Sequence, residues 1–350
     1  MEHYTDEQYE QLRRRRHQQR MRKYRRRQRI IEMIAVLVLV AAVVVPIVIF
    51  TRDKTPEPPT TPTVSDDTVT PEEPEKPAVV YPTATADTVS LGESVDADYA
   101  VLVDVTTGEI VAQKNPDAQV YPASVTKVMT LLVAVENATD MNETFKMSYA
   151  FLDPLYLDGA TMAGFSSGEE VTVKDMLYGC ILPSGADATA GLAHLLAGSE
   201  EAFAAMMNAK AAELGLKNTH FVNSSGLHHR DHYTTTLDMA VVMMAAMENP
   251  TCNEVLSTYQ YTTASTPQHP DGLLLTSTMF SRMYGTEPEG ATIIAGKTGY
   301  TPQAMHTMVS YAKGDNGHDY VFVSMYGTDK WQATYDAINV LTAFCGQQTQ

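Results

Sequence analysis

The most informative segment of the sequence is a run of nine residues, Pro122-Ala123-Ser124-Val125-Thr126-Lys127-Val128-Met129-Thr130. Proline ahead of a first turn and serine at its start are helix-start signals, so we expect an apolar helix over residues 124–136. Ser124 and Lys127 then lie on one face, a turn apart. Serine is a weak nucleophile that needs a nearby base, and a lysine can be that base where burial lowers its pKa. The first turn also offers a backbone N–H to an oxyanion.

The same spacing occurs a second time, in Ser310-Tyr311-Ala312-Lys313. That copy falls in a predicted strand, over 306–312, that runs into a turn. Alternate residues of a strand point to opposite faces, so this serine and lysine should not meet. We interpret the second copy as coincidence, and the spacing alone is therefore weak support for a serine–lysine pair.

Two other short segments carry polar residues between glycines and apolar elements. Ser184 lies in Pro183-Ser184-Gly185-Ala186-Asp187-Ala188, between two predicted helices, and in isolation it is explained as a capping or turn serine. Lys297 and Thr298 lie in Gly296-Lys297-Thr298-Gly299-Tyr300, at the end of a predicted strand. Flanking glycines let a ligand approach the backbone closely, although a strand end with a surface lysine explains this segment better when it is taken by itself.

Taken in order, Ser-x-x-Lys, Ser-Gly-x and Lys-Thr-Gly form the signature of the penicillin-recognising serine enzymes. Over roughly residues 98–330 the sequence resembles one branch of them, the serine D-alanyl-D-alanine carboxypeptidases or low-molecular-weight penicillin-binding proteins. The segments that carry the resemblance are 122–130, 171–177 with 182–185, 223–227 with 232–235, and 297–301. Ala186 departs from the family, which usually has asparagine at that position.

The resemblance implies a role for each matching residue. Ser124 would attack the carbonyl between two terminal D-alanines, Lys127 would accept its proton, and Ser184 would relay a proton to the leaving amine. The substrate-binding residues would be Lys297, Thr298, Gly299 and Tyr300, with the backbone N–H groups of Ser124 and Tyr300 forming the oxyanion hole. The implied substrate is a peptidoglycan stem peptide, β-lactams would be inhibitors that acylate Ser124, and no cofactor or metal is required.

Strand and helix patterns predict an α+β fold. Strands are expected over 99–105, 109–113, 291–298, 306–312 and 320–326, and helices over 173–182, 186–197, 200–214, 236–247 and 330–344. Strands at both ends with helices between them favour one antiparallel sheet flanked by helices, with an inserted helical subdomain, as in β-lactamase-like and DD-peptidase-like folds.

The formal net charge of −17 is the sum of a basic N-terminal segment and an acidic remainder. Residues 1–29 carry +7 and residues 51–350 carry −23, and between them lies an apolar run over 30–50. That run would be about 31 Å long as a helix, which matches a bilayer core. The positive-inside rule predicts a cytoplasmic tail at 1–29, a single membrane helix at 30–50 and an extracellular remainder. A cleaved signal peptide is the alternative.

Residues 51–97 hold eight prolines among Thr, Glu and Asp, and they lack the apolar residues that a core needs. We expect a disordered stalk there, followed by one catalytic domain over 98–350. The basic tail beside a membrane helix is better explained as a topology signal than as a nucleic-acid site.

The leading hypothesis is a membrane-anchored serine D-Ala-D-Ala carboxypeptidase, a hydrolase of the cell-wall side. Two alternatives remain open. One is a related β-lactamase, although no Glu-x-x-Leu-Asn segment is present to activate the deacylating water. The other is a non-catalytic peptidoglycan-binding module, which Ala186 keeps open and which intact Ser124, Lys127 and Lys297 disfavour.

Overall fold

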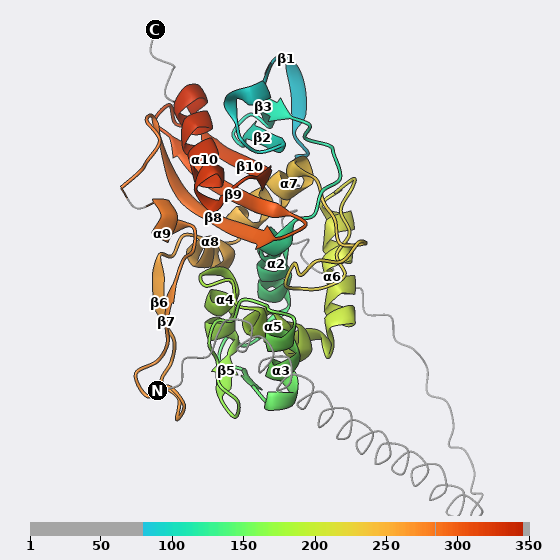
Figure 1. The fold of residues 1–350 in the computed structure, drawn as a ribbon, viewed down its shortest axis with the longest axis vertical. Helices are drawn as coiled ribbons and strands as arrows, with labels where there is room; N and C mark the ends of the chain where they lie inside the picture. The colour runs from blue at the N-terminus through green and yellow to red at the C-terminus, as the bar shows by residue number, and fades with distance from the viewer. Residues whose placement is uncertain (1–79, 284, 346–350) are drawn as a thin grey trace, which may run out of the picture. The chain divides into compact units, whose positions relative to one another are not determined.

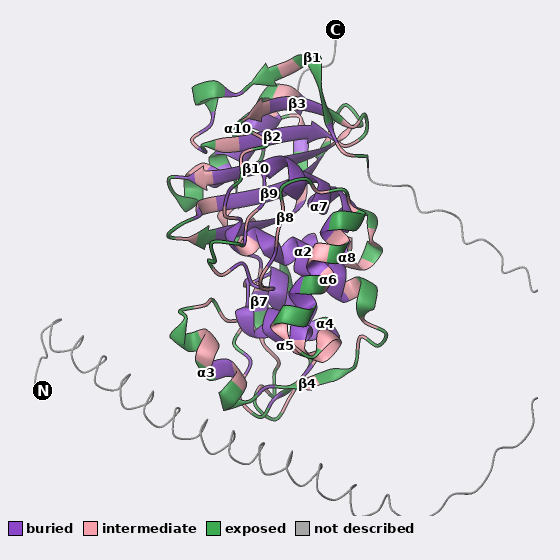
Figure 2. Ribbon diagram, turned by 90° about the vertical axis from the view of Figure 1, so that its right-hand side faces the viewer, coloured by how far each residue is buried: buried purple, intermediate pink, exposed green. Residues whose placement is uncertain are grey.

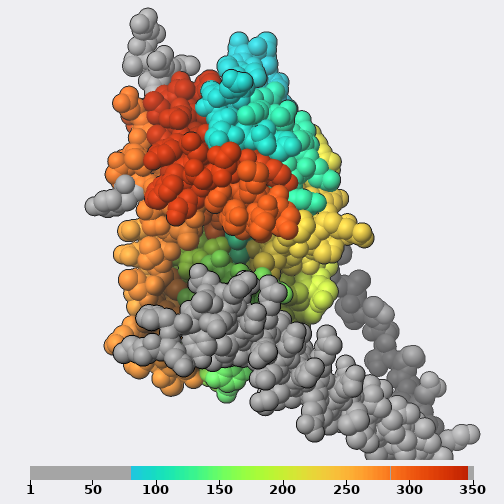
Figure 3. All heavy atoms as spheres, in the orientation of Figure 1, coloured from blue at the N-terminus to red at the C-terminus, as the bar shows by residue number. Residues whose placement is uncertain are grey.

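The computed structural model describes residues 80–283 and 285–345, which form a sheet of six strands and a set of helices (Figure 1). The strand order is β1-β3-β2-β10-β9-β8. The strands are β1 (Thr83–Ser90), β2 (Tyr99–Asp104), β3 (Glu109–Lys114), β8 (Ala291–Thr301), β9 (Met305–Gly314) and β10 (Asp319–Gly327). Because β2 pairs antiparallel with β10, the two ends of the described chain close the sheet. Figure 3 shows the first strands lying against the last ones on a single surface.

Alternation along the strands buries both faces of this sheet (Figure 2). On β10, Phe322 faces one apolar cluster and Val321 and Val323 face the other. The first cluster is completed by α10 (Lys330–Cys345), and the second by the helices between β3 and β8. The predicted strands from both termini and the α+β arrangement are confirmed.

The helical part lies between β3 and β8 in the chain. Its helices are η2 (Ala123–Thr126), α2 (Lys127–Asn137), α3 (Tyr149–Leu157), α4 (Val173–Ile181), α5 (Ala186–Ala197), α6 (Glu200–Glu213), α7 (Thr236–Glu248), α8 (Pro250–Leu256) and α9 (Phe280–Met283). Hydroxyl caps fix the starts of four of them, because Ser148, Thr172, Ser199 and Thr235 each accept a backbone N–H of the first turn.

Two small antiparallel sheets, which the sequence did not indicate, interrupt the helices. One pairs β4 (Thr144–Lys146) with β5 (Glu170–Thr172), and the other pairs β6 (Gln260–Thr262) with β7 (Leu274–Thr276). Each strand has only three residues, which is too short for alternation to be recognised.

The expected stalk over 51–97 is wrong at its C-terminal end, and so is the domain start at residue 98. Residues 83–90 form β1, which pairs parallel with β3 and makes the sheet mixed, not purely antiparallel. Most side chains of β1 are exposed, so its composition resembles that of a stalk. Backbone pairing holds it, and Leu91, Val95 and Ala97 are already buried in the core.

The predicted tail at 1–29, the membrane helix at 30–50 and the stalk up to residue 79 lie outside the described residues. Within 80–283 and 285–345, no helix has the length and apolar character needed to cross a bilayer.

The first described residues are tied to the helical part by a buried carboxylate. Tyr81 Oη donates to Asp238 Oδ1 at 2.7 Å, and Lys217 Nζ lies 3.9 Å from the centroid of the Tyr81 ring. We expect Tyr81→Phe to lower the free energy of unfolding by about 2 kcal/mol, since one hydrogen bond to a charged group is lost. Chemical denaturation of the full chain measures it. Tyr149→Phe, at a side chain that is 72% exposed, is the matched control and should change nothing.

Candidate active site

Ser124 lies in a tight turn that leads directly into α2. The expected helix over 124–136 is a 3₁₀ turn, η2, followed by an α-helix that begins at Lys127. Ala123, just before the serine, has φ of +49°, a left-handed conformation at the start of the turn. Lys127 Nζ donates to Ser124 Oγ at 3.1 Å, so the predicted pair is in contact.

Lys127 is almost fully buried, with 2% of its side chain exposed. Its second acceptor is a backbone carbonyl, Ser225 O, at 2.6 Å. Burial lowers the pKa of Lys127 to about 8, against a weaker raising effect from the charges of Asp187 and Glu200. At pH 7 about a tenth of this amine is therefore unprotonated and able to take a proton from the adjacent hydroxyl, and the fraction grows as the pH rises.

The loop Asn223–Leu227 packs against the turn that carries Ser124. Thr130 Oγ1 donates to Ser224 O at 2.6 Å, and the carboxylate of Glu200 accepts from the backbone N and the hydroxyl of Ser224. Gly226 has φ of +80°, and a Cβ there would lie 1.9 Å from Ala123 O. The loop can approach the turn this closely only because residue 226 is glycine.

His232 is a second support beneath the turn. Val222 N donates to its Nδ1 at 3.2 Å, so Nε2 carries the proton and donates to Thr126 Oγ1 at 2.9 Å. Burial lowers the pKa of His232 to about 3, which keeps the ring neutral. In the sequence this histidine opens the segment 232–235, which carries the family resemblance without assigning it a role, and the contact with Thr126 gives it a position in the site.

Ser184 is buried and strained, and it does not act as a helix cap. Its φ is +68°, a conformation that favours glycine, and within the described part of the chain its Oγ has no hydrogen-bond partner. The cap position of α5 is Gly185, which offers no side chain. A buried hydroxyl left unpaired in a strained loop indicates a functional role more than a capping one.

Asp187 fixes the loop opposite Ser184. Its carboxylate accepts from the backbone N–H groups of Ala163, Gly164 and Phe165 at 2.7 to 3.2 Å. The carboxylate is fully buried, so these charge-assisted bonds are strong. They hold residues 163–165 against the start of α5.

Lys297 and Thr298 lie on β8, an edge strand of the six-stranded sheet. Only 1% and 4% of these residues, respectively, are exposed. Lys297 Nζ donates to Thr298 O at 2.7 Å. Burial, followed by the nearby charge of Lys127, holds the pKa of Lys297 well below its ordinary value. The two lysines are thus close enough to repel each other.

Gly299 brings β8 against the turn that carries Ser124. A Cβ at this position would lie 2.7 Å from Ser124 N and 3.1 Å from Val125 N. The predicted residues Ser124, Lys127, Lys297 and Gly299 therefore converge. Tyr300, next along the strand, is 57% exposed and stacks on His306 with ring centroids 4.5 Å apart.

The second serine–lysine spacing behaves as predicted from strand geometry. Ser310 is buried in the middle of β9, where its Oγ donates to Phe322 O, whereas Lys313 is exposed. This serine has no contact with a lysine that an acylation mechanism could use.

Sequence reasoning missed Arg282 on α9. This half-buried guanidinium lies close enough to Lys297 and His306 for its charge to lower the pKa of each. Arg230 and Arg282 are the two arginines among the described residues, so the rarity of arginine was the available signal.

Three features define the class of penicillin-recognising serine enzymes. They are the sheet closed by both ends of the described chain, the buried serine–lysine pair beside β8 and the strained serine before α5. Within this class the chain belongs to the D-alanyl-D-alanine carboxypeptidase family, peptidase S11, whose profile matches residues 83–328.

Individual relatives agree with this assignment. The chain is 35% identical over 225 residues to D-alanyl-D-alanine carboxypeptidase DacF of Bacillus subtilis, which covers 63% of this chain and 55% of the relative. It is 32% identical over 232 residues to DacB2 of Mycobacterium tuberculosis, covering 66% and 75%. The chain thus spans about half the length of the Bacillus relative.

Solved structures are similar over the same region. The crystal structure of the Streptomyces K15 DD-transpeptidase superposes with a TM-score of 0.63 at 28% identity, covering 71% of this chain and 96% of that one. The D-alanyl-D-alanine carboxypeptidase from Mycobacterium tuberculosis gives a TM-score of 0.60 at 30% identity, covering 70% and 89%.

The close approach of Gly226 to Ala123 predicts that this glycine is essential. Gly226→Ala should lower the free energy of unfolding by more than about 3 kcal/mol, because left-handed strain is added to a clash with backbone. Gly215→Ala is the matched control. It has φ of +69° and no atom within 4 Å, so it should cost only about 1 kcal/mol. Thermal unfolding of both variants measures the difference, and equal losses would contradict the packing argument.

Proposed function

We propose that the protein is a serine D-Ala-D-Ala carboxypeptidase that removes the terminal D-alanine from peptidoglycan stem peptides. The observation that carries this proposal is the buried Lys127, whose Nζ is 3.1 Å from Ser124 Oγ and whose pKa is lowered to about 8. A surface lysine at pKa above 10 would stay charged and could not activate the serine.

The reaction would proceed through a covalent intermediate. Lys127 takes the proton of Ser124 as Oγ attacks the carbonyl of the penultimate D-alanine, and the backbone N–H groups of Ser124 and Tyr300 stabilise the oxyanion. The proton on Lys127 then passes through Ser184 to the nitrogen of the scissile amide, the C–N bond breaks, and D-alanine leaves. Water then attacks the acyl-enzyme, which releases the shortened peptide and returns the proton to Ser124.

Cationic groups at the end of the site suit a substrate with a free carboxylate, because a bound carboxylate would raise the lowered pKa of Lys297 and favour its charged form. Lys297 and Thr298 would hold that carboxylate, and Arg282 adds a second cation nearby. The same arrangement would accept the carboxylate of a β-lactam, which would acylate Ser124 and act as an inhibitor.

Ala186, where the family usually has asparagine, raises the question of whether the site is active. The side chain of Ala186 is buried, and Lys127 has two acceptors without any amide from residue 186. This arrangement supports catalysis over a non-catalytic binding module.

We place the enzyme on the outer face of a bacterial cell membrane, anchored by residues 30–50 with its N-terminus in the cytoplasm. The support is the charge asymmetry across the apolar run, +7 before it and −23 after it.

A fluorescent penicillin should label the full-length chain, and Ser124→Ala should abolish labelling, because the nucleophile is removed. Gel fluorescence measures it. Ser310→Ala, which removes the serine of the second Ser-x-x-Lys, is the matched control and should label normally. The wild type should also release D-alanine from a Lys-D-Ala-D-Ala peptide faster than it turns over the β-lactam. An unlabelled wild type would contradict an enzymatic role, and the reverse preference would favour a β-lactamase.

The rate of acylation should rise with pH through about 8 and level off above it. Lys127 acts as base only when neutral, and its neutral fraction grows as pH passes its lowered pKa. Stopped-flow measurement of penicillin acylation between pH 6 and pH 10 tests this. A rate that falls over this range would show that the charged amine is the active form.

A further inference from the structure

Thr298, expected to bind the substrate carboxylate, has a hydrogen-bond partner that belongs to no sequence motif. Thr278 Oγ1 lies 2.9 Å from Thr298 Oγ1. Thr278 is half-buried and follows β7 by two residues. Its backbone N donates to Leu182 O at 3.0 Å, so Thr278 also touches the segment that leads to Ser184.

Either of the two hydroxyls can donate in the free protein, and a carboxylate bound at Thr298 would select one direction. Among the described residues, Thr298 Oγ1 is the single hydrogen-bond partner of Thr278 Oγ1. If Thr278 donates its proton to Thr298 Oγ1, the proton of Thr298 stays free to point into the site. A carboxylate can only accept, so Thr298 binds one as a donor and needs that free proton.

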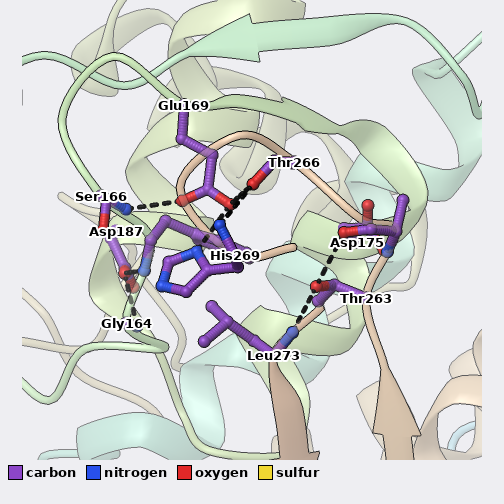
Figure 4. A network of polar contacts seen from close by, with 11 residues as sticks. Gly164, Ser166, Glu169, Asp175, Asp187, Thr263, Thr266, His269 and Leu273 are labelled. Carbon is purple, nitrogen blue, oxygen red and sulfur yellow. Dashed lines mark hydrogen bonds and ion pairs between the residues drawn. The ribbon is translucent and has the colours of Figure 1, made fainter. Parts of the chain in front are cut away.

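Thr278 stands at the base of the β6–β7 hairpin, which two buried carboxylates anchor (Figure 4). Glu169 accepts from Thr266 Oγ1 at 2.8 Å and from His269 Nδ1 at 2.9 Å, and both residues lie in the hairpin loop. Asp175 accepts from Tyr261 Oη at 2.9 Å and from Ala264 N at 3.2 Å.

These contacts join the hairpin to the helical part at several points, and Tyr261 also stacks on Tyr178 with centroids 3.8 Å apart. Ser277 N donates to Tyr259 O at 2.8 Å and closes the base of the hairpin. The backbone of Thr278 is thus held by its own bond to Leu182 O and by the bond of the preceding residue, Ser277, to Tyr259 O.

We propose that Thr278 is a positioning residue that orients the hydroxyl of Thr298 toward the terminal carboxylate and so makes the enzyme selective for peptides with a free C-terminus. This inference rests on the proposed function. It assigns part of the carboxylate specificity to the β6–β7 hairpin, which lies outside the three motifs.

The test compares two substrates, a Lys-D-Ala-D-Ala peptide with a free carboxylate and the same peptide as a C-terminal amide. In full-length Thr278→Val, we expect kcat/KM for the acid to fall about tenfold, mainly through KM, because one hydrogen bond to a charged group is weakened. The value for the amide should stay within about twofold, since the amide lacks the charge that the Thr298 proton binds. Thr278→Ser, which keeps the hydroxyl, should restore the preference for the acid.

Thr266→Val is the matched control within the same hairpin. It also removes one threonine hydroxyl, here the donor to Glu169, and it should lower stability without changing the ratio of acid to amide. An equal loss on both substrates in Thr278→Val, or the same ratio change in Thr266→Val, would overturn the proposal. A wild-type enzyme that hydrolyses neither peptide would instead refute the proposed function.

Discussion

The burial of two lysines without a carboxylate in contact is the constraint on which the site depends. Removing an ammonium from water is costly, and a contacting carboxylate would offset that cost by fixing the charge. Here the acceptors are backbone carbonyls, Ser225 O for Lys127 and Thr298 O for Lys297. A carbonyl satisfies the N–H groups yet compensates charge poorly, so the pKa of each lysine falls. Pairing Lys127 with a carbonyl and not with a carboxylate costs stability, and it leaves the amine able to act as a base.

This constraint accounts for the local architecture around the nucleophile. A carbonyl can serve as a lysine acceptor only if its loop is held rigidly, and the loop 223–227 is held by Glu200, Thr130 and the close approach of Gly226. On the other side, Gly299 lets β8 come against Ser124 N, which brings the second lysine near the first. The sheet that joins both chain ends thereby sets the distance between residues that are 170 positions apart in sequence.

Sequence alone could predict the elements that carry their own signals. The helices α5 and α7 were expected within one residue of their observed bounds, because apolar runs and a cap such as Thr235 mark them. The strand β1 could not be recognised, since its exposed side chains mimic a linker and its stability comes from backbone pairing. Ser124, Lys127 and Lys297 were found because short motifs hold them. His232, Thr278 and Arg282 act through partners 15 to 106 residues away, and no local pattern encodes such contacts.

The segment Ser184-Gly185-Ala186 illustrates how a strained site can tolerate a change at one of its positions. A left-handed serine and an unpaired buried hydroxyl each cost on the order of 1 to 3 kcal/mol, so neighbouring contacts must hold Ser184 in place. Those contacts come from Asp187, whose carboxylate accepts four backbone N–H groups, and from Gly185 N, which donates to Gly179 O. None of them uses the side chain of residue 186. The geometry of Ser184 is therefore independent of an asparagine at that position, and alanine there removes a polar group from the site without releasing the loop that carries the serine.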